Sequence, residues 1–189
     1  MHKIALFASG SGTNVENIAN YFSKSNSIEV SLVLSNNSGA YVLERAKKLN
    51  IDTFTFNRSQ FYNSTDIINI LTENRIDYIV LAGFLWLIPV NIIEAFSNKI
   101  VNIHPALLPK YGGKGMYGNK VHEAVVANRE KQSGITIHLV NEKYDDGSII
   151  FQQACEVLPT DSANDVANKV HALEYKHYPE TIEKLILGL

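Results

Sequence analysis

The sequence predicts an α/β domain with an open, mostly parallel sheet, helices on both faces and an antiparallel hairpin near the C-terminal end. Through the first hundred residues, short β-branched runs alternate with amphipathic segments, which is the pattern of strand–helix–strand units. Later the rhythm changes to two closely spaced strand-like runs, typical of a hairpin. Because 189 residues suit one domain with a substantial core, we expect residues 1–189 to form a single unit.

The parallel half is expected to contain five strands, each a short apolar run. They are residues 4–8, 30–34, 52–56, 78–81 and 100–102. Apolar residues follow the first strand at helical spacing: Val15, Ile18, Ala19 and Phe22. An amphipathic helix is therefore predicted there, with Thr13 or Asn14 as its cap.

The C-terminal half is expected to hold the hairpin and a long helix. Residues 134–140 and 148–154 are the two strands, separated by a turn-rich segment. Residues 163 to about 186 have a helical pattern. Because proline lacks an N–H, Pro179 should kink or interrupt this helix.

Composition and charge exclude several classes of function. The 17 Lys and Arg residues balance 19 Asp and Glu, giving a net charge of -2, and no basic run suits a nucleic-acid backbone. No segment resembles an export signal or a membrane span, so we expect a cytoplasmic protein without a membrane or nucleic-acid partner. Cys155 is expected to be a buried structural thiol.

Five of the six histidines show no spacing typical of metal ligands, so no metal site is expected. We interpret these five as structural or exposed. They are His2, His122, His138, His171 and His177.

Asn102 and His104 are the most informative residues of the chain. They end an apolar run two positions apart, so they share one face of a strand that Pro105 should end. At the carboxyl edge of an open α/β sheet, an amide and an imidazole suit the stabilisation of an oxyanion during a reaction at a carbonyl. Alternatively, Asn102 caps the sheet end and His104 bonds to a turn.

Residues 9–14, Ser-Gly-Ser-Gly-Thr-Asn, follow the first strand and open the first helix. Backbone N–H groups and the helix dipole there can hold a phosphate. Val15 replaces the third glycine of a dinucleotide fingerprint, which favours a monophosphate site. The alternative is a simple tight turn.

Two further segments have a structural and a functional interpretation. Asp145, in the loop Tyr-Asp-Asp-Gly, is an ordinary turn residue unless it reaches His104, where it would raise the imidazole pKa and fix its tautomer. The apolar residues 81–89 form either core or the pocket wall for a flat aromatic ligand.

Together, Ser-Gly-Ser-Gly-Thr-Asn, Ala-Gly-Phe, Asn-Ile-His-Pro-Ala-Leu-Leu-Pro-Lys-Tyr and Tyr-Asp-Asp-Gly resemble the phosphoribosylglycinamide formyltransferase family of purine synthesis. The resemblance covers essentially the whole chain in the right order. It implies an open sheet of Rossmann type, a phosphate- and ribonucleotide-binding N-terminal half, and a C-terminal half for folate binding and catalysis. The glycine-rich residues 112–119 depart from the family pattern, and we expect them to cover the ribonucleotide or to form a rigid turn.

The resemblance also implies the roles of individual residues. Gly12, Thr13 and Asn14 would hold the phosphate of glycinamide ribonucleotide, and Glu174 its glycinamide end. Asn102, His104 and Asp145 would be the catalytic set. The pterin of the co-substrate 10-formyltetrahydrofolate would contact Leu85, Trp86, Leu87, Ile88, Asn102, Asn141, Glu142, Lys143, Tyr144 and Asp145.

The implied reaction is direct attack of the substrate amine on the formyl carbon. The protein is expected to be a monomer or a homodimer. His104 as an imidazolium and Asn102 would stabilise the oxyanion, and Asp145 would keep His104 protonated. One alternative is a formyltetrahydrofolate hydrolase, whose family carries a further N-terminal domain; methionyl-tRNA formyltransferase would need a further C-terminal one. Another alternative is a nucleotide-binding module without turnover.

Overall fold

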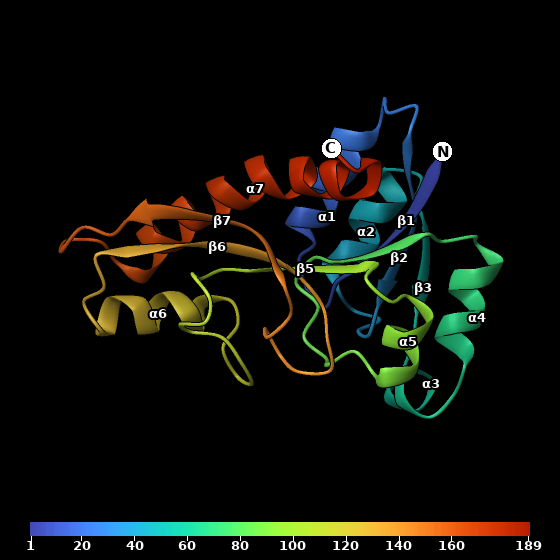
Figure 1. Ribbon diagram of the computed structural model, residues 1–189, viewed down its shortest axis with the longest axis horizontal. Helices are drawn as coiled ribbons and strands as arrows, with labels where there is room; N and C mark the ends of the chain where they lie inside the picture. Colours follow the sequence, from blue (N-terminus) through green and yellow to red (C-terminus); the bar gives the residue numbers. More distant parts are fainter.

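A computed structural model describes residues 1–189 and has a seven-stranded sheet at its centre (Figure 1). Its order is β3-β2-β1-β4-β5-β6-β7. The first five strands are parallel to one another, and the pairings of β5 with β6 and of β6 with β7 are antiparallel. The strands are β1 (His2–Phe7), β2 (Ile28–Ser35), β3 (Asp52–Thr55), β4 (Tyr78–Leu81), β5 (Ile100–His104), β6 (Gln132–Leu139) and β7 (Ile149–Glu156). The predicted fold class is confirmed.

Seven helices cover the two faces of the sheet. They are α1 (Thr13–Phe22), α2 (Tyr41–Lys48), α3 (Arg58–Tyr62), α4 (Asp66–Glu73), α5 (Val90–Ala95), α6 (Asn119–Ala127) and α7 (Ala163–Leu187). One apolar core includes residues of α1, α2, α6 and α7, and the other includes residues of α3, α4 and α5. Along β1, Ile4 and Leu6 enter the first core and Ala5 and Phe7 the second, because successive strand side chains point to opposite faces. No helix is both long and apolar enough to cross a membrane.

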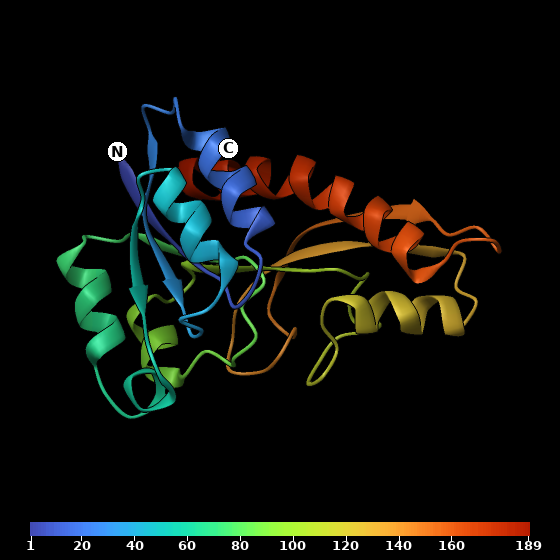
Figure 2. The same cartoon turned by 180° about the vertical axis from the view of Figure 1, so that it is seen from behind.

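The antiparallel strands extend away from the parallel part of the sheet, with α6 and the first half of α7 beside them (Figure 2). β5 ends at His104, directly before Pro105 as predicted, and so extends past the expected run 100–102. Its last residues pair with β6: Asn102 lies opposite His138, and His104 lies opposite Thr136. This pairing holds the end of β5 beyond the last residue of β4.

Pro179 does not interrupt α7, which is helical from Ala163 to Leu187. Proline leaves the carbonyl four residues earlier, that of Tyr175, without its helical donor. Asn17 of α1 supplies one, since its Nδ2 donates to this carbonyl at 2.8 Å. The expected interruption is wrong because a neighbouring side chain replaces the missing hydrogen bond.

The predicted cap of α1 is also wrong. Gly12 is the N-cap residue, in the left-handed conformation with φ 75°, and no side chain caps this helix. A Cβ at Gly12 would collide with Val42 of the core, which explains the glycine. Asn14 is instead free to contact α7.

The buried Tyr178 fixes α7 against the carboxyl ends of two strands. Its hydroxyl donates to the carbonyl of Leu81 at 2.9 Å and lies 3.2 Å from that of Val101. The preceding turn of α7, which carries Glu174, is thereby placed at the same edge of the sheet.

Candidate active site

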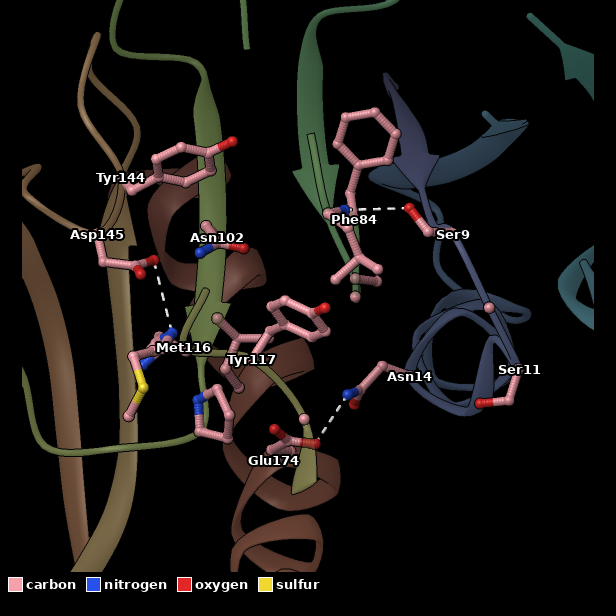
Figure 3. Close-up of a pocket in the computed structure, with 18 of the residues that line it drawn as sticks. Ser9, Ser11, Asn14, Phe84, Asn102, Met116, Tyr117, Tyr144, Asp145 and Glu174 are labelled. Carbon is pink, nitrogen blue, oxygen red and sulfur yellow. Dashed lines mark hydrogen bonds and ion pairs between the residues drawn. The ribbon is translucent and has the colours of Figure 1, made fainter. Parts of the chain in front are cut away.

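A cavity of about 590 Å³ opens at the carboxyl ends of β1, β4 and β5. The strand order reverses between β1 and β4, which is where open α/β sheets bind ligands. The cavity joins the two predicted sites, because residues 9–14 and residues 102–105 both line it. In Figure 3, Asn102 and Asp145 lie on one side and Asn14 and Glu174 on the other.

The loop between β1 and α1 is fixed by contacts with neighbouring segments. The N–H of Val42 donates to the carbonyl of Gly10 at 3.1 Å, and Nε of Arg45 donates to that of Ser11 at 2.9 Å. With no side-chain cap, the first N–H groups of α1 are open to the cavity. The loop thus has the geometry of an anion site at a helix N-terminus.

The structure brings Asp145 to His104, although 40 positions separate them in the chain. Oδ1 of Asp145 lies 3.5 Å from Nδ1 of His104, and Oδ2 accepts from the N–H of Gly113 at 2.8 Å. The other ring nitrogen, Nε2, lies 2.7 Å from the carbonyl oxygen of Tyr111, which requires a proton on Nε2. A second proton on Nδ1 would therefore face the carboxylate.

Only glycine fits at position 147, the last residue of Tyr-Asp-Asp-Gly. A Cβ at Gly147 would collide with the carbonyl group of Leu139, where the loop returns beside β6. Asp145 itself has φ 53°, a left-handed conformation that aspartate tolerates better than most residues. This backbone geometry places the carboxylate beside the end of β5.

The pKa values of the pair shift in the same direction for different reasons. Burial lowers the pKa of His104, and this outweighs the raising effects of Asp145 and of the bond to Tyr111. Asp145 reaches His104 and raises its pKa as expected, but burial has the larger effect, so the net pKa of His104 in the unliganded protein lies below its ordinary value. Burial raises the pKa of Asp145, but His138, His104 and the Gly113 N–H together hold it below its usual value, so Asp145 is a carboxylate at neutral pH.

His138 belongs to this cluster, although we interpreted it as structural or exposed. Its Nδ1 lies 2.8 Å from the carbonyl oxygen of Leu139, which requires a proton on Nδ1, and its Nε2 lies 3.8 Å from Oδ1 of Asp145. Nδ2 of Asn102 lies 3.1 Å from this Nε2, which orients the Asn102 amide. Alternation along β6 places His138 on the same face as Thr136, but only the pairing with β5 brings it to Asn102.

A buried hydroxyl fixes the chain just after His104. Oγ1 of Thr136 donates to the carbonyl of Ala106 at 2.7 Å, and accepts from the N–H of Leu108 at 3.0 Å and from Nε2 of Gln152 at 2.8 Å. Thr136 is fully buried. The segment that follows the catalytic-site strand is thus bonded to β6.

Replacing Thr136 with Val should lower the free energy of unfolding by about 2–4 kcal/mol, because two buried backbone groups lose their partner. Urea denaturation monitored by circular dichroism measures this. The matched control is Thr136→Ser, which keeps the hydroxyl and should lose only about 1 kcal/mol. Equal stability of Thr136→Val and the wild type would contradict the assignment.

The opposite side of the cavity carries Glu174, which is 5% exposed. Its Oε2 accepts from Nδ2 of Asn14 at 2.9 Å, as Figure 3 shows, and lies 3.0 Å from Nδ1 of His171. His122 of α6 also lines the cavity. The interpretation of His122 and His171 as merely structural or exposed is thus incomplete, because both face the same space as the phosphate loop.

Only some of the residues expected to bind folate line the cavity. Leu85, Asn102, Tyr144 and Asp145 line the cavity. Those that do not line it are Trp86, Leu87, Ile88, Asn141, Glu142 and Lys143. Trp86 instead packs among aromatic rings, including a stacked Tyr62 at 5.9 Å between ring centroids. A folate contact of these six residues stays a prediction.

The glycine-rich residues 112–119 form one wall of the cavity. Lys114, Met116 and Tyr117 line it, and Figure 3 draws Met116 and Tyr117 among the lining residues. Gly113 and Gly115 have φ of 92° and 93°, which other residues rarely adopt. The segment therefore lines the cavity and leads into α6, and its role as a cover over the ribonucleotide stays a prediction.

Comparison with known proteins places the whole chain among related sequences and structures. Residues 2–182 match the sequence model of the family described as formyl transferase. The phosphoribosylglycinamide formyltransferase of Bacillus subtilis is 36% identical over 194 residues, covering 100% of this chain and 96% of that protein. The chloroplastic enzyme of that name from Arabidopsis thaliana is 38% identical over 186 residues, covering 95% of this chain, which spans only 64% of that relative's length. The crystal structure of glycinamide ribonucleotide transformylase 1 from Symbiobacterium toebii has a TM-score of 0.90 and 31% identity, covering 100% of this chain and 89% of that one.

Proposed function

Because the chain belongs to the formyl transferase family, in its phosphoribosylglycinamide formyltransferase branch, we propose that it formylates glycinamide ribonucleotide with 10-formyltetrahydrofolate. The products are the N-formyl ribonucleotide and tetrahydrofolate, in a step of purine synthesis. The observation that carries this proposal is one cavity with a phosphate loop on one side and Asn102, His104 and Asp145 on the other.

The two substrates occupy opposite sides of the cavity in this proposal. Gly12, Thr13 and Asn14 hold the phosphate at the N-terminus of α1, and Glu174 binds the glycinamide end. The pterin lies towards Leu85 and Tyr144, and six of the ten predicted folate residues lie outside the cavity lining. Holding both substrates in one cavity makes the transfer effectively unimolecular, which lowers the barrier.

The reaction begins with attack of the ribonucleotide amine on the formyl carbon. The carbonyl oxygen becomes an oxyanion, which the Asn102 amide and the Nε2–H of His104 stabilise, each contributing about 3 kcal/mol. For His104 this means exchanging its present acceptor, the Tyr111 carbonyl, for the charged oxygen. Collapse of the tetrahedral intermediate breaks the bond to the folate nitrogen, which takes the proton that the amine loses.

Asp145 stabilises the protonated form of His104 and assists the loss of the proton from the substrate amine. Negative charge on the oxyanion favours the imidazolium, whose second proton on Nδ1 then faces the Asp145 carboxylate. The low resting pKa of His104 is compatible with this role, because the charge that raises it forms during the reaction. Asp145 also orients a water that relays the amine proton.

The deciding experiment measures tetrahydrofolate formation by absorbance, with and without glycinamide ribonucleotide. We expect formation that depends on the ribonucleotide, with one formyl product for each folate product. Folate product with free formate and no ribonucleotide would assign a hydrolase, and no turnover would assign a binding module. We also propose a cytoplasmic location and a monomer or homodimer, which fractionation and gel filtration test.

A cavity-facing glycine tests the phosphate loop. Gly12 is unsuitable, because any side chain would collide with Val42 and disturb folding. A Cβ at Gly10 meets no atom within 4 Å and projects from the cavity lining. Gly10→Leu should raise the KM for the ribonucleotide by roughly tenfold or more and leave the KM for folate nearly unchanged.

The matched control is Gly39→Leu, at a glycine outside the cavity where a Cβ would meet only Asn37 at 3.6 Å. Steady-state kinetics with each substrate varied in turn gives both KM values. Equal increases of the two values in Gly10→Leu would mean that the loop is only a structural turn.

A further inference from the structure

Residues 111–113 bond to both members of the His104–Asp145 pair. The carbonyl oxygen of Tyr111 accepts from Nε2 of His104 at 2.7 Å, and the N–H of Gly113 donates to Oδ2 of Asp145 at 2.8 Å. One short segment of backbone thus supplies an acceptor to the imidazole and a donor to the carboxylate. The position of this segment therefore sets the position of both side chains.

Tyr111 adopts a backbone conformation that its own side chain disfavours. Its φ is 57°, in the left-handed region, where a Cβ crowds the following carbonyl oxygen and glycine is the usual residue. Glycines occupy positions 112 and 113, directly after this position, but not the position itself. A tyrosine held at such a φ indicates that surrounding contacts fix it and that its side chain is needed there.

The hydroxyl of Tyr111 is bound at the end of α6, where it donates to Oε1 of Glu130 at 3.0 Å. The backbone at this helix end forms a Schellman motif: Arg129 has φ 52° and donates its N–H to the carbonyl of Val126 at 3.0 Å. The N–H of Glu130 donates to the carbonyl of Val125 at 3.1 Å. The Tyr111 side chain therefore connects the backbone of the active site to a rigid helix end.

The bond between Tyr111 and Glu130 has a neutral donor and a charged acceptor. Burial, and then the bond to Glu130, raise the pKa of the Tyr111 hydroxyl, so it keeps its proton. Hydrogen bonds from Lys110 and then from Tyr111 lower the pKa of Glu130, which is a carboxylate at neutral pH. Hydrogen bonds with one ionised partner are stronger than those between neutral groups, so this bond can hold the segment in place.

We propose that Tyr111 and Glu130 are positioning residues for formyl transfer, because the bond between their side chains holds residues 111–113 where they orient His104 and Asp145. This inference rests on the proposed function. Neither Tyr111 nor Glu130 lines the cavity, so both act through the catalytic pair and not on a substrate.

The position of Tyr111 decides which nitrogen of His104 carries the proton. A neutral imidazole has one N–H, and two acceptors compete for it: the Tyr111 carbonyl at Nε2, and the Asp145 carboxylate 3.5 Å from Nδ1. The shorter distance, 2.7 Å to the carbonyl, favours the proton on Nε2. If Tyr111 moves away, the proton shifts to Nδ1, and Nε2 has no hydrogen to donate to the oxyanion.

Two substitutions remove the bond, one from each side. Tyr111→Phe keeps the ring, which packs against the apolar core, and Glu130→Ala removes the acceptor. Each should lower kcat about tenfold, the size of one hydrogen bond to a charged group, and leave both KM values nearly unchanged. Because both substitutions remove the same bond, the double variant should also lose about tenfold and not about a hundredfold.

Two controls separate this bond from the charges around it. Lys110→Ala removes the exposed ion pair with Glu130 but leaves the bond to Tyr111, so kcat should stay as in the wild type. Glu130→Gln removes the charge but keeps an oxygen that accepts from the Tyr111 hydroxyl, so it should recover most of the activity lost in Glu130→Ala. Thermal unfolding of each variant is recorded with the kinetics.

The ¹⁵N NMR spectrum of the His104 imidazole gives a measurement that a merely structural role would not change. The wild type without substrates should carry the proton on Nε2, whereas Tyr111→Phe and Glu130→Ala should show a population with the proton on Nδ1. The bond to Tyr111 also raises the pKa of His104, so this pKa should be lower in both variants. The titratable groups that act on His104 are the same in all variants: Asp145, His138 and Glu174.

Three results would overturn the inference: wild-type kcat in Tyr111→Phe, a roughly hundredfold loss in the double variant, or a His104 spectrum that neither substitution changes. Failure of the proposed function gives a different result. The wild type would then form no formyl product from the ribonucleotide. The imidazole spectra need no substrate, so they would still show whether Tyr111 and Glu130 orient His104.

Discussion

His104→Ala lowers kcat by about 10²–10³-fold, because it removes a donor to the oxyanion. The loss appears in kcat and in kcat/KM alike, since the bond is made mainly in the transition state, and the KM values of both substrates change less. Stopped-time assays of tetrahydrofolate formation under saturating substrate measure it. His104 is 4% exposed, so thermal unfolding of the variant must be recorded with the kinetics.

Two further variants separate chemistry from folding. His104→Gln places its amide nitrogen near the position of Nε2, so its N–H can reach the Tyr111 carbonyl, but the amide cannot take up a proton at neutral pH. It should therefore fold like the wild type and lose nearly as much activity as His104→Ala. His177→Ala removes a histidine outside the cavity and should keep full activity. Near-normal turnover in His104→Gln would show that proton uptake by His104 has no role.

The strands and their order of appearance follow from local sequence, because periodicity and glycine turns act over short distances. Residues 78–81 are a strand as predicted, and the apolar residues of α1 are buried as predicted. The end of β5 at His104 follows from Pro105, whereas its pairing with β6 depends on a segment that is distant in sequence. The continuity of α7 through Pro179 likewise depends on Asn17, which is distant in sequence.

The candidate site shows the same division between local and long-range information. Asn102 and His104 could be proposed from two adjacent signals, a strand end and a proline. His138 could not, because its contact with Asn102 requires the antiparallel pairing of β5 with β6. The effect of Asp145 on His104 is predicted in the right direction, but the net pKa of His104 is not predictable from the sequence, because the burial that outweighs Asp145 is a property of the fold.

Asp145→Asn should lower kcat by roughly 10²–10⁴-fold, as expected when the acidic partner of a catalytic imidazole loses its charge. Asparagine has the same shape, and its Oδ1 can still accept from the N–H of Gly113, so folding should be retained. What is lost is the negative charge beside Nδ1 of His104, which favours the imidazolium. Substrate KM values should change little, because the side chain acts through His104.

A spectroscopic measurement distinguishes this role from a structural one. Because Asp145 raises the pKa of His104 against the effect of burial, removing its charge should lower that pKa further, which ¹⁵N NMR of the imidazole detects. Asp146→Asn, one residue away and half-exposed, is the matched control and should leave both turnover and the His104 titration unchanged. If Asp145→Asn lost activity while the His104 titration stayed as in the wild type, Asp145 would act on the proton-relaying water alone, and the charge coupling between the two residues would be refuted.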